Sequence, residues 1–130
     1  MSKRMIATLT AEHLVMLNAT EETRNNLAKL RENQDVASVQ AGLLDFSHLI
    51  EHTVHQHFPQ EEEKLFPKLQ EKDKSLMEQE HREVGQAHQD LKAELQQDIP
   101  DPKAIIFAVE ALVDKLEGHL RRENDILANL

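Results

Sequence analysis

The spacing of apolar residues restricts the fold of this chain more than any other feature. Along residues 11–32 and just before them, residues three or four positions apart form one stripe: Leu9, His13, Met16, Leu17, Thr20, Leu27 and Leu30. A stripe with this period lies on one face of an α-helix. Thr10 is the expected N-cap of this helix. No part of the chain shows the strict alternation that is typical of a β-strand.

Three more segments repeat the helical period. The second helix is expected over about residues 36–66, with Asp35 as its N-cap. The third is expected over about residues 75–95, and its opening sequence SLME is a capping box. The fourth is expected to begin with Asp101 as its cap and Pro102 at the first helical position.

Four amphipathic helices joined by short polar segments predict an all-α protein, an up-down-up-down antiparallel four-helix bundle. A chain of 130 residues is long enough for one hydrophobic core, so we expect a single domain over residues 1–130. The composition agrees, because helix-forming residues dominate and there are only three glycines and four prolines.

Composition and charge exclude several classes of function. The formal net charge of −9 argues against a nucleic-acid partner, because no basic patch offsets the acidic surface. The absence of cysteine excludes disulfides, thiol catalysis and cysteine-ligated metal sites. No apolar run resembles a signal peptide or a membrane span, so we expect a cytoplasmic protein with no membrane partner. The sequence does not indicate a protein partner.

Polar side chains interrupt the apolar stripe of every predicted helix. In an up-down bundle, the beginnings of the first and third helices lie beside the ends of the second and fourth. The sequence therefore predicts that six buried polar side chains meet at one end of the core: His13, His57, Glu61, His81, His119 and Glu123. A Glu-His dipeptide begins at Glu12 and again at Glu80, and each is followed one helix later by His-x-x-x-Glu. This repeat indicates two similar halves that together hold two metal ions.

Burial of these groups without partners would be costly. An unsatisfied buried polar group costs ~1–3 kcal/mol and an unpaired buried charge costs more. A small domain is stable by only ~5–15 kcal/mol in total. The six side chains could satisfy one another, but divalent metal compensates the two carboxylates more directly. Imidazole and carboxylate ligands without thiolate suit iron, manganese or zinc, and carboxylate-bridged pairs suit iron or manganese best.

Pro59 lies inside the predicted second helix. A proline there removes the hydrogen bond to the carbonyl of His55 and disfavours helical geometry at Phe58. We expect a kink between His57 and Glu61 that shapes the metal cavity. The alternative is a helix break before a separate short helix.

Four stretches of the chain, taken in order, resemble the hemerythrin-like (HHE cation-binding) family. They are the first Glu-His pair, HFPQEEEKLFP, the second Glu-His pair and HLRREND, so the resemblance covers nearly the whole chain. It implies a four-helix bundle that holds a non-haem di-iron centre with bridging carboxylates. Carried over by position, it implies these ligands: His13, His57, Glu61, His81, His119 and Glu123.

Two positions depart from the oxygen-carrying members of that family. Those members have a second histidine on the third helix, one turn after the first, where this chain has Gly85. They also end with an aspartate five residues after the last histidine, whereas Glu123 follows His119 by four. The resemblance therefore implies coordination positions open to dioxygen, nitric oxide or peroxide. Gly85 and Gly118 could each give room beside the metal or allow close helix packing.

The sequence favours a di-iron protein that binds or reacts with a small diatomic ligand or peroxide, in oxygen handling, sensing, or the response to iron and oxidative stress. It favours a metal- and oxygen-binding protein over a dedicated enzyme. The alternatives are an iron donor for the repair of iron–sulfur centres, a ferritin-like iron oxidase and a metal-free structural bundle. A ferritin-like site uses paired Glu-x-x-His motifs, and this chain has one, Glu78 with His81.

The remaining polar residues of interest are expected to have structural or outer roles. His88 is predicted to be a satisfied core histidine, and Glu80 is a candidate for an outer or labile ligand. A second stripe on the second helix is predicted to face solvent: His48, His52 and His55. Glu62 and Glu63 are expected to be exposed charges.

Overall fold

The computed structural model describes residues 1–130 and is helical throughout, without strands. The all-α expectation is confirmed. Four rods form the molecule: α1 (Lys3–Asn33), then α2 (Gln40–His52) continued by a π-turn, η2 (Thr53–His57), and α3 (Phe58–Lys64), then α4 (Glu71–Leu95) and α5 (Pro102–Ala128). Two short 3-10 turns precede and follow the second rod along the chain, η1 (Val36–Ser38) and η3 (Phe66–Lys68).

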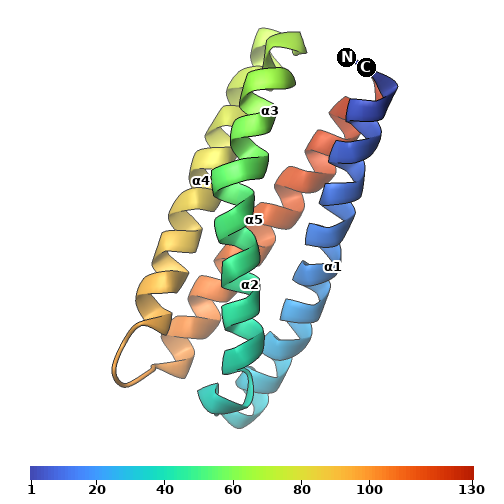
Figure 1. The fold of residues 1–130 in the computed structure, drawn as a ribbon. Helices are drawn as coiled ribbons and strands as arrows, with labels where there is room; N and C mark the ends of the chain where they lie inside the picture. Colours follow the sequence, from blue (N-terminus) through green and yellow to red (C-terminus); the bar gives the residue numbers. More distant parts are fainter.

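The four rods pack side by side as a helical bundle. α1 contacts α2 and α5, and α4 contacts the same two helices from the other side. In Figure 1, both chain termini lie at one end of the bundle, together with the connection between α3 and α4. The connections after α1 and after α4 lie at the opposite end. None of the helices has the length and apolar character that crossing a membrane requires.

The hydrophobic core is divided into two parts. The larger cluster includes Met16, Phe58, Val84 and Leu120, and the smaller one contains Leu9, Leu65, Phe66, Met77 and Leu127. Along each rod, the predicted polar residues fall between members of these two clusters, as His13 does between Leu9 and Met16. A polar layer therefore separates the two hydrophobic clusters near the end of the bundle that carries the termini.

Two predicted helix starts are wrong, and in each case the helix begins earlier. α1 begins at Lys3, where the Ser2 hydroxyl accepts the amide hydrogen of Met5 at 3.1 Å. Thr10 lies inside the helix, and its hydroxyl donates to the carbonyl of Ile6 at 2.8 Å. The extra turns add Leu9 to the smaller core cluster and pack the partly buried Met5 and Ile6 against it, which gives the tertiary reason for the longer helix.

The predicted capping box of Ser75 and Glu78 is also not an N-terminus, because α4 begins at Glu71. Gln70 occupies the cap position without a side-chain hydrogen bond. Glu71 and Asp73 lie in the first turn, where carboxylates interact favourably with the helix dipole. The predicted start therefore lies one turn inside the helix.

The other two predicted caps are present, one of them in a modified role. Asp101 accepts the amide hydrogen of Lys103 at 3.0 Å and caps α5, as expected, with Pro102 at the first helical position. Asp35 accepts the amide hydrogen of Ala37 at 3.1 Å, but it caps the 3-10 turn η1 and not the long helix.

The chain stays helical around Pro59. His57 (φ −66°, ψ −48°) and Phe58 (φ −62°, ψ −48°) keep helical angles, so the alternative of a helix break at this point is wrong. The adjustment lies one turn earlier, in the π-turn η2, where the amide of Phe58 donates to the carbonyl of Thr53. A π-turn is a known way to fit an irregular residue into a helix. α3 ends at Lys64, two residues before the predicted end.

Candidate metal centre

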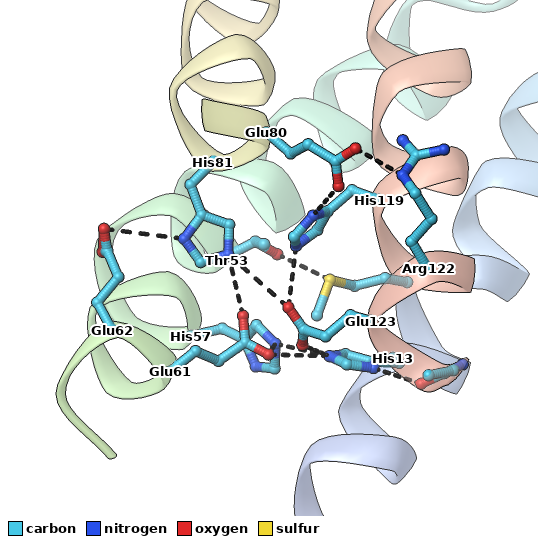
Figure 2. A network of polar contacts seen from close by, with 12 residues as sticks. His13, Thr53, His57, Glu61, Glu62, Glu80, His81, His119, Arg122 and Glu123 are labelled. Carbon is cyan, nitrogen blue, oxygen red and sulfur yellow. Dashed lines mark hydrogen bonds and ion pairs between the residues drawn. The ribbon is translucent and has the colours of Figure 1, made fainter. Parts of the chain in front are cut away.

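The structure brings all six predicted residues together in the polar layer. His13 comes from α1, His57 from the π-turn, Glu61 from α3 and His81 from α4, and α5 supplies the last pair, His119 and Glu123. Figure 2 shows their side chains pointing toward one another between the four rods. Each of the six is at most 5% exposed. The predicted convergence at one end of the core is therefore observed.

Glu61 lies between three imidazoles. Its Oε2 is 3.1 Å from Nε2 of His13 and 3.1 Å from Nε2 of His57. Its Oε1 is 3.2 Å from Nε2 of His81. One carboxylate thus contacts both halves of the centre, which is the arrangement that a bridging ligand requires.

Glu123 makes the second connection between the halves. Its Oε1 is 2.8 Å from Nε2 of His13, and its Oε2 is 3.1 Å from Nε2 of His119 and 4.0 Å from Nε2 of His81. Two groups of ligand atoms result, each with its atoms within 4.8 Å of one another: His13, His57, Glu61 and Glu123, and Glu61, His81, His119 and Glu123. Both carboxylates belong to both groups.

Oxygen acceptors hold the outer nitrogens of three of the imidazoles. Nδ1 of His13 lies 2.7 Å from Oδ1 of Asn124, and Nδ1 of His119 lies 2.9 Å from Oε1 of Glu80. Nδ1 of His57 contacts the carboxylate of Glu12. Because these oxygens can only accept, they place the ring proton on Nδ1 and turn the Nε2 lone pair toward the centre. Metal-binding histidines have the same outer contacts.

Several of the inner atoms are not satisfied by one another. Nε2 of His13 and Nε2 of His57 face each other at 3.1 Å, although neither carries a proton in the tautomer set by its outer partner. Three further inner atoms are buried without a hydrogen-bond partner: Nε2 of His119 and both carboxylate oxygens of Glu123. These atoms lie within ion-pair distance of neighbours but lack hydrogen-bond geometry.

A cation fits this donor set better than protons do. Nε2 of His13 or His57 can donate to Glu61 only if that ring is doubly protonated, because its Nδ1 proton is already held by an outer oxygen, and burial opposes the added charge. His81, whose Nδ1 has no hydrogen-bond partner, can donate to Glu61 as a neutral ring. Burial lowers the pKa of His119 below its ordinary value in spite of the contact with Glu80. A divalent cation accepts lone pairs from nitrogen and carboxylate oxygen alike, so it removes both the lone-pair repulsion and the unsatisfied atoms.

Two carboxylates in and around the centre, Glu61 and Glu80, are held in the ionised form. Burial raises the pKa of Glu61, but contacts with His13, His57 and His81 outweigh burial and bring it well below its usual range. Burial likewise raises the pKa of Glu80, and contacts with His119 and Arg122 outweigh it. Metal ligation needs ionised carboxylates, and these two are in that state at neutral pH.

Glu80 was expected to be either an outer partner of the centre or a labile ligand. It is an outer partner, because it contacts the outer nitrogen of His119. While its Oε1 holds His119, its Oε2 accepts a hydrogen bond from Nε of Arg122 at 2.6 Å. Gly118 makes room for this arginine, because a Cβ at position 118 would lie 3.0 Å from an Nη atom of Arg122. Because Arg122 belongs to the same helix, close packing against another helix does not explain this glycine.

Gly85 lies beside open space. A Cβ placed there would meet no atom within 4 Å outside its own stretch of helix, so close helix packing does not explain the glycine. The space beside Gly85 on α4 is open.

Glu12 and Asn124 are functional residues that were not predicted from the sequence. The signal for Glu12 was present in the repeated Glu-His dipeptide. In each copy, the glutamate before the histidine holds the histidine of a different rod: Glu12 holds His57, and Glu80 holds His119. Asn124 had no comparable signal, because it follows Glu123 as an ordinary polar residue.

The other histidines lie as predicted. His88 is buried, with its Nε2 3.0 Å from the Ser47 hydroxyl and its Nδ1 3.5 Å from Glu51. The second stripe of the second rod is exposed: His48, His52 and His55. Glu62 and Glu63 are exposed too, although Glu62 lies 3.8 Å from Nδ1 of His81, an atom without a hydrogen-bond partner.

Comparison with protein families agrees with this geometry. Residues 4–130 match the family described as the hemerythrin HHE cation-binding domain. Searches of curated proteins and of solved structures gave no match. The family match covers nearly the whole chain and all six residues of the centre, and its description names cation binding. This protein therefore belongs to the hemerythrin HHE cation-binding domain family.

Proposed function

We propose that this protein holds a non-haem di-iron centre and binds or reacts with dioxygen, nitric oxide or peroxide. The observation that carries the proposal is the convergence of four imidazole Nε2 atoms and two shared carboxylates in one buried layer. Manganese or zinc could occupy the same ligands, because affinity follows a general order and cellular supply decides the metal.

The donor set leaves room for an outside ligand. Each group of ligand atoms offers four donors, two imidazoles and two shared carboxylates. Octahedral ions such as iron and manganese take about six donors, so each ion would keep positions that the protein does not fill. Bound iron would supply a redox-active Lewis acid to a small ligand at these positions. This supports ligand binding over a purely structural metal.

The residues of the chain have distinct tasks in this proposal. Glu61 and Glu123 would bridge the ions, and the four imidazoles would hold one ion in each half. Glu12, Glu80 and Asn124 orient the rings and keep their protons on the outer nitrogens. The hydrophobic clusters on both sides of the layer limit the access of water.

An alternating up-down-up-down order of the rods is part of the proposal. The position of both termini at one end of the bundle and the short connections between rods support it (Figure 1). A cytoplasmic location stays a prediction from the sequence.

The structure does not favour the ferritin-like alternative. Glu78, the glutamate of the one Glu-x-x-His motif, is absent from both groups of converging ligand atoms. Iron donation would use the same buried centre and is distinguished from ligand binding by transfer of iron to an apo-cluster protein in vitro.

The experiment that tests the proposal is anaerobic reconstitution with ferrous iron, followed by absorption spectra after addition of dioxygen, nitric oxide or peroxide. We expect about two irons per chain and a new charge-transfer band with at least one of the three reagents. Failure to bind iron would overturn the di-iron proposal. Stable iron binding with no spectral response to any of the reagents would overturn the ligand-binding part alone.

A further inference from the structure

The metal centre is buried, so a cation needs a path to reach it. Each of its six residues is at most 5% exposed. Among five surface cavities of 190–390 Å³ on the bundle, one is lined by a residue of the centre. This cavity is a groove between α1 and the second rod, and His57 forms part of its wall.

The groove has the size and the donors that a hydrated cation needs. Its volume is about 350 Å³, whereas an ion with six waters fills roughly 200 Å³ at about 30 Å³ per water. Its polar lining consists of carboxylate, imidazole, hydroxyl and amide groups, which include Glu12, His52, Gln56 and Gln60. Oxygen and imidazole donors can replace the water ligands of a divalent cation one at a time.

Glu12 connects the groove to the centre. Its carboxylate contacts Nδ1 of the buried His57 while its side chain stays 38% exposed. The corresponding Glu80 is 10% exposed and is occupied by Arg122. Two outer carboxylates hold a ring, Glu12 and Glu80. Of these, Glu12 is the one that a cation in solvent can reach, and it forms no ion pair with a lysine or arginine.

The π-turn forms the opposite wall of the groove. Thr53, Gln56 and His57 all belong to it and all line the groove. A π-turn is wider than an α-helical turn and has weaker local hydrogen bonding, and such turns are frequent at functional sites. The distortion associated with Pro59 therefore lies where the buried imidazole meets the groove.

We propose that this groove is the entry route for the divalent cation, with Glu12 as its first charged contact on the way to His57. The inference rests on the proposed metal-binding function and adds to it the route by which the centre is filled. Changes at the rim of the groove should alter the rate at which the centre takes up metal. They should not alter the final metal content, because the rim residues are not among the proposed ligands.

The test blocks the rim of the groove and leaves the centre unchanged. Val15 lines the groove and is 58% exposed, whereas its neighbour Leu14 is 59% exposed and does not line it. We compare Val15→Trp with Leu14→Trp by following anaerobic uptake of Co²⁺ through its visible absorption in stopped flow. Val15→Trp should slow uptake by about tenfold, as expected when binding first requires a side chain to move aside. Leu14→Trp should load at the wild-type rate, and all proteins should reach the same final cobalt content.

A second variant keeps the test independent of the bulky substitution. His52→Ala removes a donor from the groove wall and should slow uptake by roughly threefold. His55→Ala removes another exposed imidazole, one outside the groove, and should have no effect. Wild-type rates in both Val15→Trp and His52→Ala, or equal slowing by Leu14→Trp, would overturn the route. A wild-type protein that takes up no cobalt at any time would instead overturn the proposed metal binding itself.

Discussion

The two halves of the centre share two glutamates but are supported differently. In the half formed by His13 and His57, the outer nitrogens contact the neutral amide of Asn124 and the carboxylate of Glu12. In the half formed by His81 and His119, Glu80 holds one ring and is itself fixed by Arg122. The Glu80 side chain is 10% exposed and that of Glu12 is 38% exposed.

This difference separates a histidine with a buried support from one whose support is exposed to solvent. His119 is held by a buried and charge-compensated carboxylate, so its ring is oriented before any cation arrives. His57 is held by a carboxylate that also faces solvent, so its support can exchange with water or a cation. In the same half as His119, the ring of His81 has no outer support, because its Nδ1 is buried without a hydrogen-bond partner.

The largest effect is expected when both halves are broken at once. Glu61→Ala removes the carboxylate that contacts His13, His57 and His81. We expect it to abolish stable binding of both ions, because it removes a ligand and leaves a hole between three rods. Elemental analysis after anaerobic reconstitution measures the loss, and His48→Ala, at an exposed position, is the matched control. Retention of wild-type metal content would contradict the shared role of this glutamate.

The comparison of the halves is sharpened by changing their outer carboxylates one at a time. Glu80→Gln and Glu12→Gln should each lower metal affinity within the roughly 10–100-fold range found for such partners. Glu80→Gln should lie at the upper end, because it leaves Arg122 without its ion pair and its site is buried. Glu12→Gln should lie at the lower end, because water can replace a half-exposed carboxylate. Competition titration with a metal chelator measures both, and the reverse order would show that exposure does not decide their strength.

The pH dependence of the metal-free protein gives a smaller effect, with a defined sign. Burial lowers the pKa of His119 in the folded state, so below about pH 6.5 the unfolded chain binds a proton that the folded chain does not. The pKa of Glu61 is also lowered, which adds a loss below about pH 4.3. The free energy of unfolding should therefore fall as the pH falls through each range.

Urea unfolding of metal-free protein between pH 8 and pH 4 measures the contribution of His119 to this dependence. His119→Gln should reduce the slope around pH 6.5, since it removes the group that titrates only in the unfolded chain. A stability that rises on acidification would contradict the assignment of His119 as a neutral ligand.

The smallest effect is expected from the two glycines near the halves. Gly85→Ala meets open space in a helix interior and should stabilise the protein by about 1 kcal/mol. Gly118→Ala should gain less or lose stability, because its Cβ would push against Arg122 and disturb the contact with Glu80. Thermal unfolding of the metal-free variants compares them. A larger gain for Gly118→Ala would indicate that Arg122 is free to move.

Much of the centre could be predicted from the sequence because helical periodicity fixes which residues face the core. His13 and Glu123 lie far apart in the chain, yet each is part of an apolar stripe, and both lie at the same end of the bundle. The stripes and the short connections were sufficient to place them together. The buried but satisfied His88 was predicted by the same reasoning.

The details that could not be predicted depend on side chains that reach between rods. The contact of Asn124 with His13 and that of Arg122 with Glu80 depend on rotamers and on space, which periodicity does not specify. The starts of α1 and α4 were also misplaced. Tertiary packing of Leu9 lengthened α1 past its local capping signal. α4 begins one turn before the Ser75 capping box, with Glu71 and Asp73 in its first turn. The π-turn before Pro59 is one of several ways to fit a proline, and the local sequence did not select among them.

The most direct test of the central claim is anomalous X-ray diffraction from crystals of the iron-loaded protein at the iron edge. The account predicts two iron peaks in each chain, one beside His13 and His57 and one beside His81 and His119, with Glu61 and Glu123 between them. A single peak, or peaks away from these side chains, would contradict it.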